Sequence, residues 1–303
     1  MKAAILSNLV VDEIVSGDLK SNQSIGGPAA YCGITARKFR FDTTLFTNFG
    51  KDLESKYLEY LRKQGISLNP SESTDIPTTR FILRYIGNDR ELILKSKCSA
   101  VNIEEIKIAK SDCWIISPVF DEVSPEILQF LTSTREKNQF IMLDPQGYTR
   151  AIDSTGRISI RKSIDMPINS LNGIKLDSKE MSCITNGLQG IDGMKKIYSK
   201  YKIDYVIHTE NQIIHLLDRE KHYWLNLPKV DAPDSTGLGD IIASSFACTM
   251  VKEKDSVWAF CFAAGALSAA LQTKEVGIRK VPSKSAMEEN ASYYYNMMNF
   301  EIL

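Results

Sequence analysis

The chain has 303 residues, 43% of them hydrophobic and 24% charged, which suits one large α/β domain and argues against disorder. Lys plus Arg equals Asp plus Glu at 37 each, so the overall charge points to neither a nucleic-acid partner nor an anionic membrane. The six cysteines contain no Cys-x-x-Cys pair, which favours free buried thiols and a cytoplasmic location. Residues 1–12 and 257–271 predict a first strand and a buried helix rather than a signal peptide and a membrane span.

Short apolar runs alternate with helical patterns along the chain. The predicted strands are 3–10, 42–47, 113–117, 140–144, 173–176 and 205–208. The predicted helices are 29–38, 52–64, 124–137, 178–185, 191–200, 241–250, 256–271 and 285–298. This alternation predicts a mostly parallel sheet covered by helices on both faces, with ligands bound at the C-terminal ends of the strands.

One region breaks the alternation. Residues 77–86 and 91–95 are rich in β-branched and aromatic residues and flank a turn at 87–90, so they predict a hairpin. Residues 13–24 offer a second extended pair. We expect a single domain over 1–303, with small-sheet strands inserted at about 11–25 and 76–98. This small sheet would act as a lid or form an ordinary edge hairpin, and the pattern favours neither.

A short loop at 234–240, Asp-Ser-Thr-Gly-Leu-Gly-Asp, runs directly into an apolar helical segment. Glycines before a helix let several backbone N–H groups point at one anion, and the helix N-terminus adds partial positive charge. Asp240 then has two interpretations. It is a favoured capping residue for the helix, or it takes a proton from a hydroxyl that attacks a bound phosphate. The rest of the chain favours the second interpretation.

Other polar residues and glycines stand where α/β sheets bind ligands. Gly26 and Gly27 open the first helix and either admit a ligand close to the backbone or form a tight turn. Asp12 follows the first predicted strand, where it can accept hydrogen bonds from substrate hydroxyls. Asp177 and Glu180 are one helical turn apart and can organise hydrated Mg²⁺ or form a capping box.

Several common motifs are missing from the sequence. There is no Gly-x-x-x-x-Gly-Lys-Ser/Thr phosphate loop and no Gly-x-Gly-x-x-Gly after the first strand, which argues against P-loop and nicotinamide enzymes. The three histidines, His208, His215 and His222, are spaced by seven residues, which fits no usual zinc pattern and favours a structural role.

Taken in chain order, these features resemble the PfkB, or ribokinase-like, family of carbohydrate and nucleoside kinases. Residues 234–240 resemble its C-terminal signature, and 26–31 are similar to its N-terminal Gly-Gly signature. Residues 47–52, 78–81 and 177–180 are similar to three further family elements, so the resemblance covers nearly the whole chain. It implies an α/β, ribokinase-like and Rossmann-type three-layer sandwich with a small β-sheet lid.

The resemblance also implies roles in catalysis. Asp240 would be the base, and the backbone N–H groups of Gly237, Leu238, Gly239 and Asp240 would form the anion hole for the γ-phosphate of ATP. Substrate contacts would come from Asp12, Gly26, Gly27, Tyr31 and Arg150. Nucleotide contacts would come from Thr209, Asn211, Thr236, Gly237 and Gly239. Asp177 and Glu180 would hold Mg²⁺ through waters, and Asp234 with Thr236 would bind a monovalent cation such as K⁺.

Some of these positions depart from the family pattern. Asp177 replaces the usual Asn, and Tyr31 stands where ribokinases carry a substrate-binding Asn. Residues 209–211 read Thr-Glu-Asn instead of Thr-x-Gly, but Asn also tolerates a left-handed backbone, so the turn can survive. Arg150 would meet a phosphate or an anionic substrate, although a structural role is equally compatible with the sequence.

The expected function is ATP-dependent phosphorylation of a hydroxyl on a small sugar or polyol. The alternatives are a nucleoside kinase of the same family and a non-catalytic nucleotide or sugar sensor on this fold. We expect a homodimer through the lid, as in some relatives, and neither a nucleic-acid nor a membrane partner.

Overall fold

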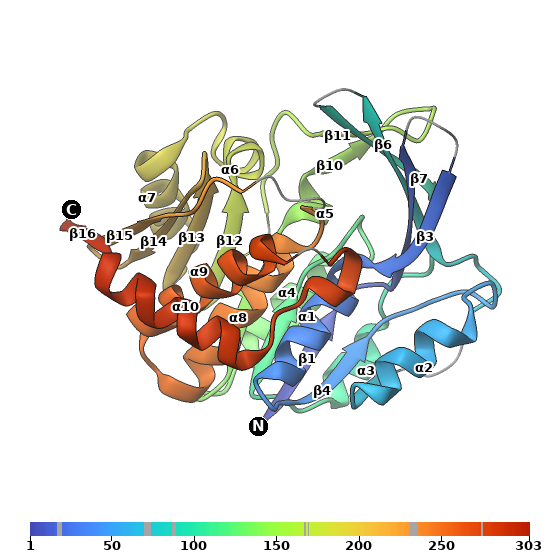
Figure 1. Ribbon diagram of the computed structural model, residues 1–303, viewed down its shortest axis with the longest axis horizontal. Coiled ribbons are helices and arrows are strands. Elements are labelled where there is room, and N and C mark those ends of the chain that lie inside the picture. The colour runs from blue at the N-terminus through green and yellow to red at the C-terminus, as the bar shows by residue number, and fades with distance from the viewer. Residues whose placement is uncertain are drawn as a thin grey trace.

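The computed structural model describes residues 1–16, 20–69, 74–86, 89–166, 168, 170–230, 235–273 and 275–303. Over these residues the chain forms three layers, with helices on both faces of a large sheet (Figure 1). A second, smaller sheet stands at one end of the molecule, at the upper right of Figure 1. The fold class predicted from the sequence is therefore confirmed.

The large sheet has ten strands in the described part of the chain. Neighbouring strands are parallel from β5 to β13, and β14, β15 and β16 continue the sheet in antiparallel fashion. In spatial order they are β5 (Ile66–Asn69), β4 (Asp42–Phe46), β1 (Lys2–Leu6), β8 (Cys113–Ile116), β9 (Phe140–Leu143), β12 (Gly173–Asp177), β13 (Tyr205–Glu210), β14 (Ile213–Asp218), β15 (Lys221–Asn226) and β16 (Asn299–Ile302).

Both faces of the large sheet are buried, because side chains alternate between them along each strand. In β1, Ala3 and Ile5 join one core and Ala4 and Leu6 the other. The first core is covered by α1 (Gly27–Lys38), α2 (Ser55–Lys63), α8 (Leu238–Glu253), α9 (Ser256–Gln272) and α10 (Lys284–Met297). The second is covered by α3 (Ile103–Ile108), α4 (Pro125–Ser133), α6 (Ser178–Thr185) and α7 (Gly190–Tyr201). The described chain also has two short helices, α5 (Gln146–Thr149) and η1 (Gly277–Lys280).

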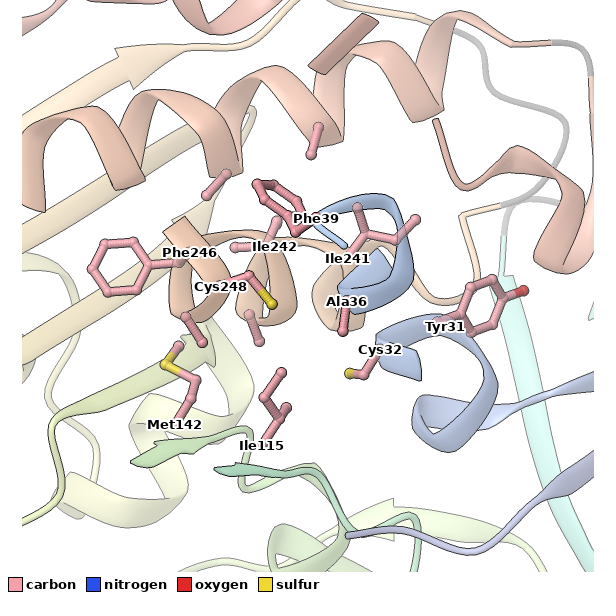
Figure 2. Packing of buried hydrophobic residues seen from close by; sticks show 14 of the residues in the cluster. Tyr31, Cys32, Ala36, Phe39, Ile115, Met142, Ile241, Ile242, Phe246 and Cys248 are labelled. Carbon is pink, nitrogen blue, oxygen red and sulfur yellow. The ribbon is translucent and has the colours of Figure 1, made fainter. Parts of the chain in front are cut away.

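Helix α8 is apolar on most sides because it lies between the sheet and other helices. Figure 2 shows Ile241, Ile242 and Phe246 of α8 packed among side chains of α1, such as Ala36, and of the strands, such as Met142. The two helices are also joined by a hydrogen bond of 3.0 Å from Ser244 Oγ on α8 to a backbone oxygen of α1. The loop that leads into α8 therefore stands on a rigid support.

The first predicted strand, 3–10, is wrong as one element. β1 ends at Leu6, because the buried Ser7 and Asn8 turn away and hydrogen bond to Glu122 at 3.3 and 3.2 Å. The chain then enters the small sheet, whose strands in spatial order are β3 (Lys20–Gly26), β2 (Val10–Ser16), β6 (Thr79–Ile86) and β7 (Asp89–Ser96). Gly87 and Asn88 of the predicted hairpin turn lie outside the described residues.

A second hairpin, not predicted from the sequence, joins the small sheet to the main body. It consists of β10 (Arg150–Ile152) and β11 (Ile158–Ile160), and we call residues 150–160 the clasp. Leu94 N on β7 donates to Gly156 O at 2.8 Å, and Arg157 forms an ion pair with Glu91. Gly156 has φ +85°, and a Cβ there would lie 2.8 Å from Leu94 O, so only glycine allows this approach.

Replacing Gly156 by alanine is expected to detach the clasp from β7, since alanine meets both an unfavourable backbone conformation and the Leu94 oxygen. Hydrogen exchange at the Leu94 amide should then accelerate by roughly tenfold or more, the factor that corresponds to losing about 1.4 kcal/mol of local stability. Gly187→Ala is the control, because Gly187 also has positive φ but no atom within 4 Å of the added carbon. Equal exchange rates in both variants would contradict the clasp.

The three histidines lie side by side on the sheet, an arrangement that fits the structural role predicted for them. Their rings stack across β13, β14 and β15, with centroids 5.8 Å apart for His208 and His215 and 5.2 Å for His215 and His222. His222 Nδ1 lies 2.9 Å from Glu301 on β16. Among the residues placed by the structure, no group of three or more His, Cys, Asp or Glu side chains is arranged to hold a metal.

All six cysteines are buried and free, as the sequence predicts. Over the described ranges, with their gaps, no helix combines the length and apolar character that crossing a membrane requires.

Candidate active site

Asp240 lies in the first turn of α8 and is 6% exposed. Its Oδ1 accepts hydrogen bonds from Ser117 Oγ at 3.2 Å and Gln146 Nε2 at 3.3 Å. Ser117 follows β8 and Gln146 begins α5 after β9, so the ends of two neighbouring strands hold the carboxylate. Burial, and after it the nearby Asp144 carboxylate, raise the pKa of Asp240 to about 7. A carboxyl with this pKa can exchange a proton near neutral pH.

The loop before α8 depends on its glycines. Gly237 is the N-cap of α8 with φ +79°, and a Cβ there would lie 2.5 Å from the ring of Tyr31. Tyr31 is 1% exposed, and its ring packs against the loop at Gly237. The first backbone N–H groups of a helix have no partner within it, and they carry the positive end of its dipole. Gly237, Leu238, Gly239 and Asp240 thus begin a helix that can bind an anion.

Asp240 stands between two cavities. The small cavity has a volume of about 120 Å³ and is lined by Asp12, Gly27, Gln146, Asp240 and apolar residues of β6 and β7, among others. The charged cavity has a volume of about 600 Å³ and is lined by both acidic and basic side chains, namely Glu91, Asp144, Arg150, Arg157, Lys175, Asp177, Lys179, Glu180 and Asp240. Gly237 and Asp240 line both, so they form the boundary where two ligands would meet.

Of the predicted substrate residues, Asp12 and Gly27 line the small cavity, and Gly26 lies against the Asp12 carboxylate. Asp12 is on β2 and is 7% exposed. A side chain at Gly26 would overlap the Asp12 carboxylate, and one at Gly27, where φ is +74°, would overlap Val10. These glycines therefore make room for their neighbours.

Two other predicted substrate residues are placed differently. Tyr31 packs beneath Gly237 and does not line either cavity in the described part of the chain, so its predicted substrate contact gains no support. Arg150 lines both cavities, where it donates to Val119 O and to Gln146 Oε1, each at 2.8 Å. Arg150 thus also holds the amide that binds Asp240.

Of the predicted nucleotide residues, Thr209 and Gly239 line a third cavity, and Gly237 lines the charged and small cavities. The apolar cavity, about 360 Å³, is lined by Thr209 with Leu227, Leu238, Ile242, Leu267 and others. Asn211 has φ +45° in the turn between β13 and β14, which is the left-handed conformation that the sequence predicts Asn can adopt. The next residue, Gln212, has φ +66° and lines the apolar cavity. Thr236 lines the small cavity, and Asp234 lies outside the described residues.

Asp177 and Glu180 form a capping box at the start of α6, which was the structural alternative for this pair. Asp177 Oδ1 accepts from Glu180 N, and Glu180 Oε2 accepts from Asp177 N, each at 2.8 Å. Burial raises the pKa of Glu180 to about 8, although Lys175 opposes this shift. These two hydrogen bonds use one oxygen of each carboxyl. The pair fits Mg²⁺ that is held mostly by phosphates and water, the usual mode for this ion.

Four residues around Asp240 were not predicted from the sequence. Ser117 and Gln146 hold its carboxylate, and Asp144 forms a buried ion pair with Lys175, with Oδ2 and Nζ 3.0 Å apart. Polar residues directly after β8 and β9 were a usable signal for the first three, because ligands bind at this end of the strands. Lys175 lies inside an apolar strand, where only the structure reveals its partner.

No family model and no curated protein matches the chain by sequence. Solved structures do match its fold. A pyrophosphate-dependent myo-inositol-1 kinase, converted into a myo-inositol-3 kinase, gives a TM-score of 0.80 at 20% identity over 97% of this chain and 99% of that one. Ribokinase from Thermotoga maritima gives 0.75 at 17% identity over 96% and 98%. A nucleoside kinase from Methanocaldococcus jannaschii gives 0.74 at 17% identity over 97% and 99%. The chain therefore has the ribokinase-like fold, as the sequence resemblance implies.

Proposed function

We propose that the protein is a kinase that transfers a phosphoryl group from ATP to a hydroxyl of a small sugar or polyol. One observation carries the proposal: Gly237 and Asp240 line both the small and the charged cavity. An acceptor in the small cavity and a donor phosphate in the charged cavity would therefore meet at the start of α8.

In this proposal the acceptor hydroxyl gives its proton to the Asp240 carboxylate as its oxygen attacks phosphorus. Ser117 and Gln146 hold the carboxylate, so the base keeps its orientation during the reaction. Backbone N–H groups of residues 237–240 would stabilise charge on the transferred phosphoryl group. Such fixed donors provide much of the catalysis in phosphoryl transfer.

The donor would lie across the charged and apolar cavities, with adenine in the apolar cavity near Thr209 and Asn211. Asp177 and Glu180 would hold Mg²⁺ through water, and the ion would neutralise charge on the phosphates. Thr236, with Asp234, would contribute to a site for a monovalent cation such as K⁺.

Pyrophosphate is a second candidate donor. Three structures with this fold are described as pyrophosphate-dependent kinases. The charged cavity, at about 600 Å³, is larger than the apolar cavity, at about 360 Å³, and its basic residues suit a short, highly charged donor.

The size of the small cavity favours a compact polyol or sugar over the alternative acceptor, a nucleoside. Its volume is about 120 Å³, and Phe81, Leu83 and Leu92 of the small sheet close one side. Closure by this sheet as a lid would exclude water, so that the polyol receives the phosphate. A homodimer through the lid would pair at β3, the outer strand of the small sheet, because β7 carries the clasp.

An assay of donor consumption, with ATP and with pyrophosphate, over a panel of polyols, sugars and nucleosides tests the proposal. We expect acceptor-dependent turnover with a sugar or polyol. Ligand binding without turnover on any member of the panel would instead indicate the non-catalytic sensor. Turnover only with nucleosides would indicate a nucleoside kinase.

Activity is expected to rise with pH and to reach half its limit near pH 7. The Asp240 carboxyl, with a pKa raised to about 7 by burial and Asp144, must be deprotonated to act as base. A plot of kcat/KM against pH checks this, since it reports the ionisation of groups in the free enzyme.

The raised pKa of Asp240 also affects stability. The Asp240 carboxyl stabilises the folded state below about pH 4, and this contribution is lost as pH rises through 7. The Tm of Asp240→Asn should therefore rise relative to wild type between pH 5 and pH 8.

A further inference from the structure

Strand β16 forms one edge of the large sheet, at the end of the molecule opposite the small sheet (Figure 1). All four of its residues are exposed, and β15 is its one neighbour among the strands that the structure describes. Proteins often protect such an edge with proline, lysine or a bulge, because its outer N–H and C=O groups can pair with another strand. β16 has none of these, since it reads Asn-Phe-Glu-Ile in unbroken register with β15.

The hydrogen-bond pattern shows which backbone groups of β16 point away from the sheet. Leu303 N, just after the strand, donates to Glu220 O at 2.8 Å. N–H groups alternate in direction along an antiparallel strand, so the N–H of Glu301 also points to β15. The N–H and C=O groups of Phe300 and Ile302 then point outward. The edge therefore offers two donors and two acceptors to another strand.

Large apolar side chains are exposed around this edge. Of the fourteen that are exposed in the described part of the chain, six lie within residues 293–303, and Phe300 and Ile302 are 61% and 72% exposed. The ring of Phe300 lies 6.1 Å from that of Tyr223 on β15, so Phe300 and Ile302 share the face of the sheet that α10 covers. Exposed apolar side chains that gather in one place mark an interaction surface.

The sequence of this edge is complementary to itself. The five residues from Met298 to Ile302 read Met-Asn-Phe-Glu-Ile, so apolar and polar side chains alternate in the same way from either end. In an antiparallel pair of two copies with the two-fold axis at Phe300, this ring faces its own copy and Met298 faces Ile302. Asn299 then faces Glu301, to whose carboxylate its amide can donate. An axis at Glu301 would instead place two carboxylates opposite each other, which destabilises a strand pair.

We propose that β16 pairs in antiparallel fashion with β16 of a second copy of this chain, which joins the two large sheets into one. A two-fold contact of this kind uses the same edge in both copies and closes it to further strands. The small sheet lies at the other end of each copy and stays uncovered (Figure 1). The pairing is separate from a contact through β3, and it does not depend on the kinase function.

Sedimentation from micromolar to sub-millimolar protein, without donor or acceptor, tests the proposal. We expect a reversible monomer–dimer equilibrium. Phe300→Lys is expected to raise the dimer Kd by roughly tenfold or more, because two like charges would face each other and an aromatic contact is lost. Ile108→Lys is the matched control. Ile108 is 82% exposed at the end of α3, away from this edge, and its replacement should change Kd by less than about threefold.

Amide hydrogen exchange of the wild-type protein locates the contact without any substitution. The amides of Phe300 and Ile302 should exchange more slowly as the protein concentration rises, because they become paired in the dimer. The amides of Glu301 and Leu303 should change little, since they pair with β15 in both states. A protein that stays monomeric, or a dimer that Phe300→Lys leaves intact, would overturn the proposal. Slowing confined to β3 would also overturn it, because the copies would then pair through the small sheet.

Discussion

Replacing Asp240 by asparagine is expected to lower kcat by roughly 10²- to 10⁴-fold, the usual effect of removing a general base. Asparagine keeps the shape of the side chain and can still pair with Ser117, which donates to Oδ1 at 3.2 Å. The fold and acceptor binding should therefore persist, so the loss appears in kcat more than in KM. Steady-state kinetics with the acceptor identified in the panel measure both constants.

Asp255→Asn is the control for a role of Asp240 in helix capping. Asp255 is the N-cap of α9, where its side chain accepts a hydrogen bond from Trp258 N at 3.0 Å. Asparagine caps helices about as well as aspartate, so this variant should keep both activity and stability. An Asp240→Asn enzyme that retains turnover within about threefold of wild type, well short of the loss of a base, is incompatible with the proposed mechanism.

Replacing Gly237 by alanine is expected to lower kcat by about 10²- to 10³-fold, as for loss of an anion-hole donor. Alanine is strained at φ +79°, and its Cβ would lie 2.5 Å from the ring of Tyr31. Because Tyr31 is buried under the loop, the backbone rather than the ring must move. The N–H groups at the start of α8 would then point away from the phosphate.

Gly190→Ala is the control that distinguishes the effect of misdirected N–H groups from the effect of backbone strain alone. Gly190 has φ +52° at the start of α7, and no atom lies within 4 Å of an added Cβ. This control should cost about 1–2 kcal/mol of stability, the usual penalty for a left-handed alanine, and leave kcat unchanged. If Gly237→Ala loses no more activity than Gly190→Ala, the loop does not act as the anion hole.

The parallel half of the fold was predictable from the sequence, except for the edge strand β5, because its other strands are buried on both faces. Such strands appear as short apolar runs, for example Cys113–Ile116 and Phe140–Leu143. Strands β14, β15 and β16 were missed, since their patterns mix polar and apolar residues and depend on neighbours for burial. The clasp was missed because its strands, β10 and β11, have only three residues each, which is too short for a pattern to show.

In the candidate site too, residues with a local sequence signal were predictable and residues that depend on distant partners were not. Glycines and carboxylates at strand ends and helix starts are local signals, so Asp240, Gly237 and Asp12 could be selected from the sequence. The partners of Asp240 could not, because Ser117 and Gln146 are separated from it by 123 and 94 residues. The pairing of Asp144 with Lys175 spans 31 residues and likewise exists only in the folded sheet.

If the small sheet is the lid of the proposed kinase, the clasp has a consequence for the speed of the catalytic cycle. The Leu94–Gly156 hydrogen bond and the Arg157–Glu91 ion pair tie β7 to the main body. Lifting the small sheet to let product leave would therefore require breaking both contacts, which adds a barrier to that motion. Opening is often slower than chemistry in enzymes with lids. For this protein we expect product release to limit turnover, with the clasp setting its rate.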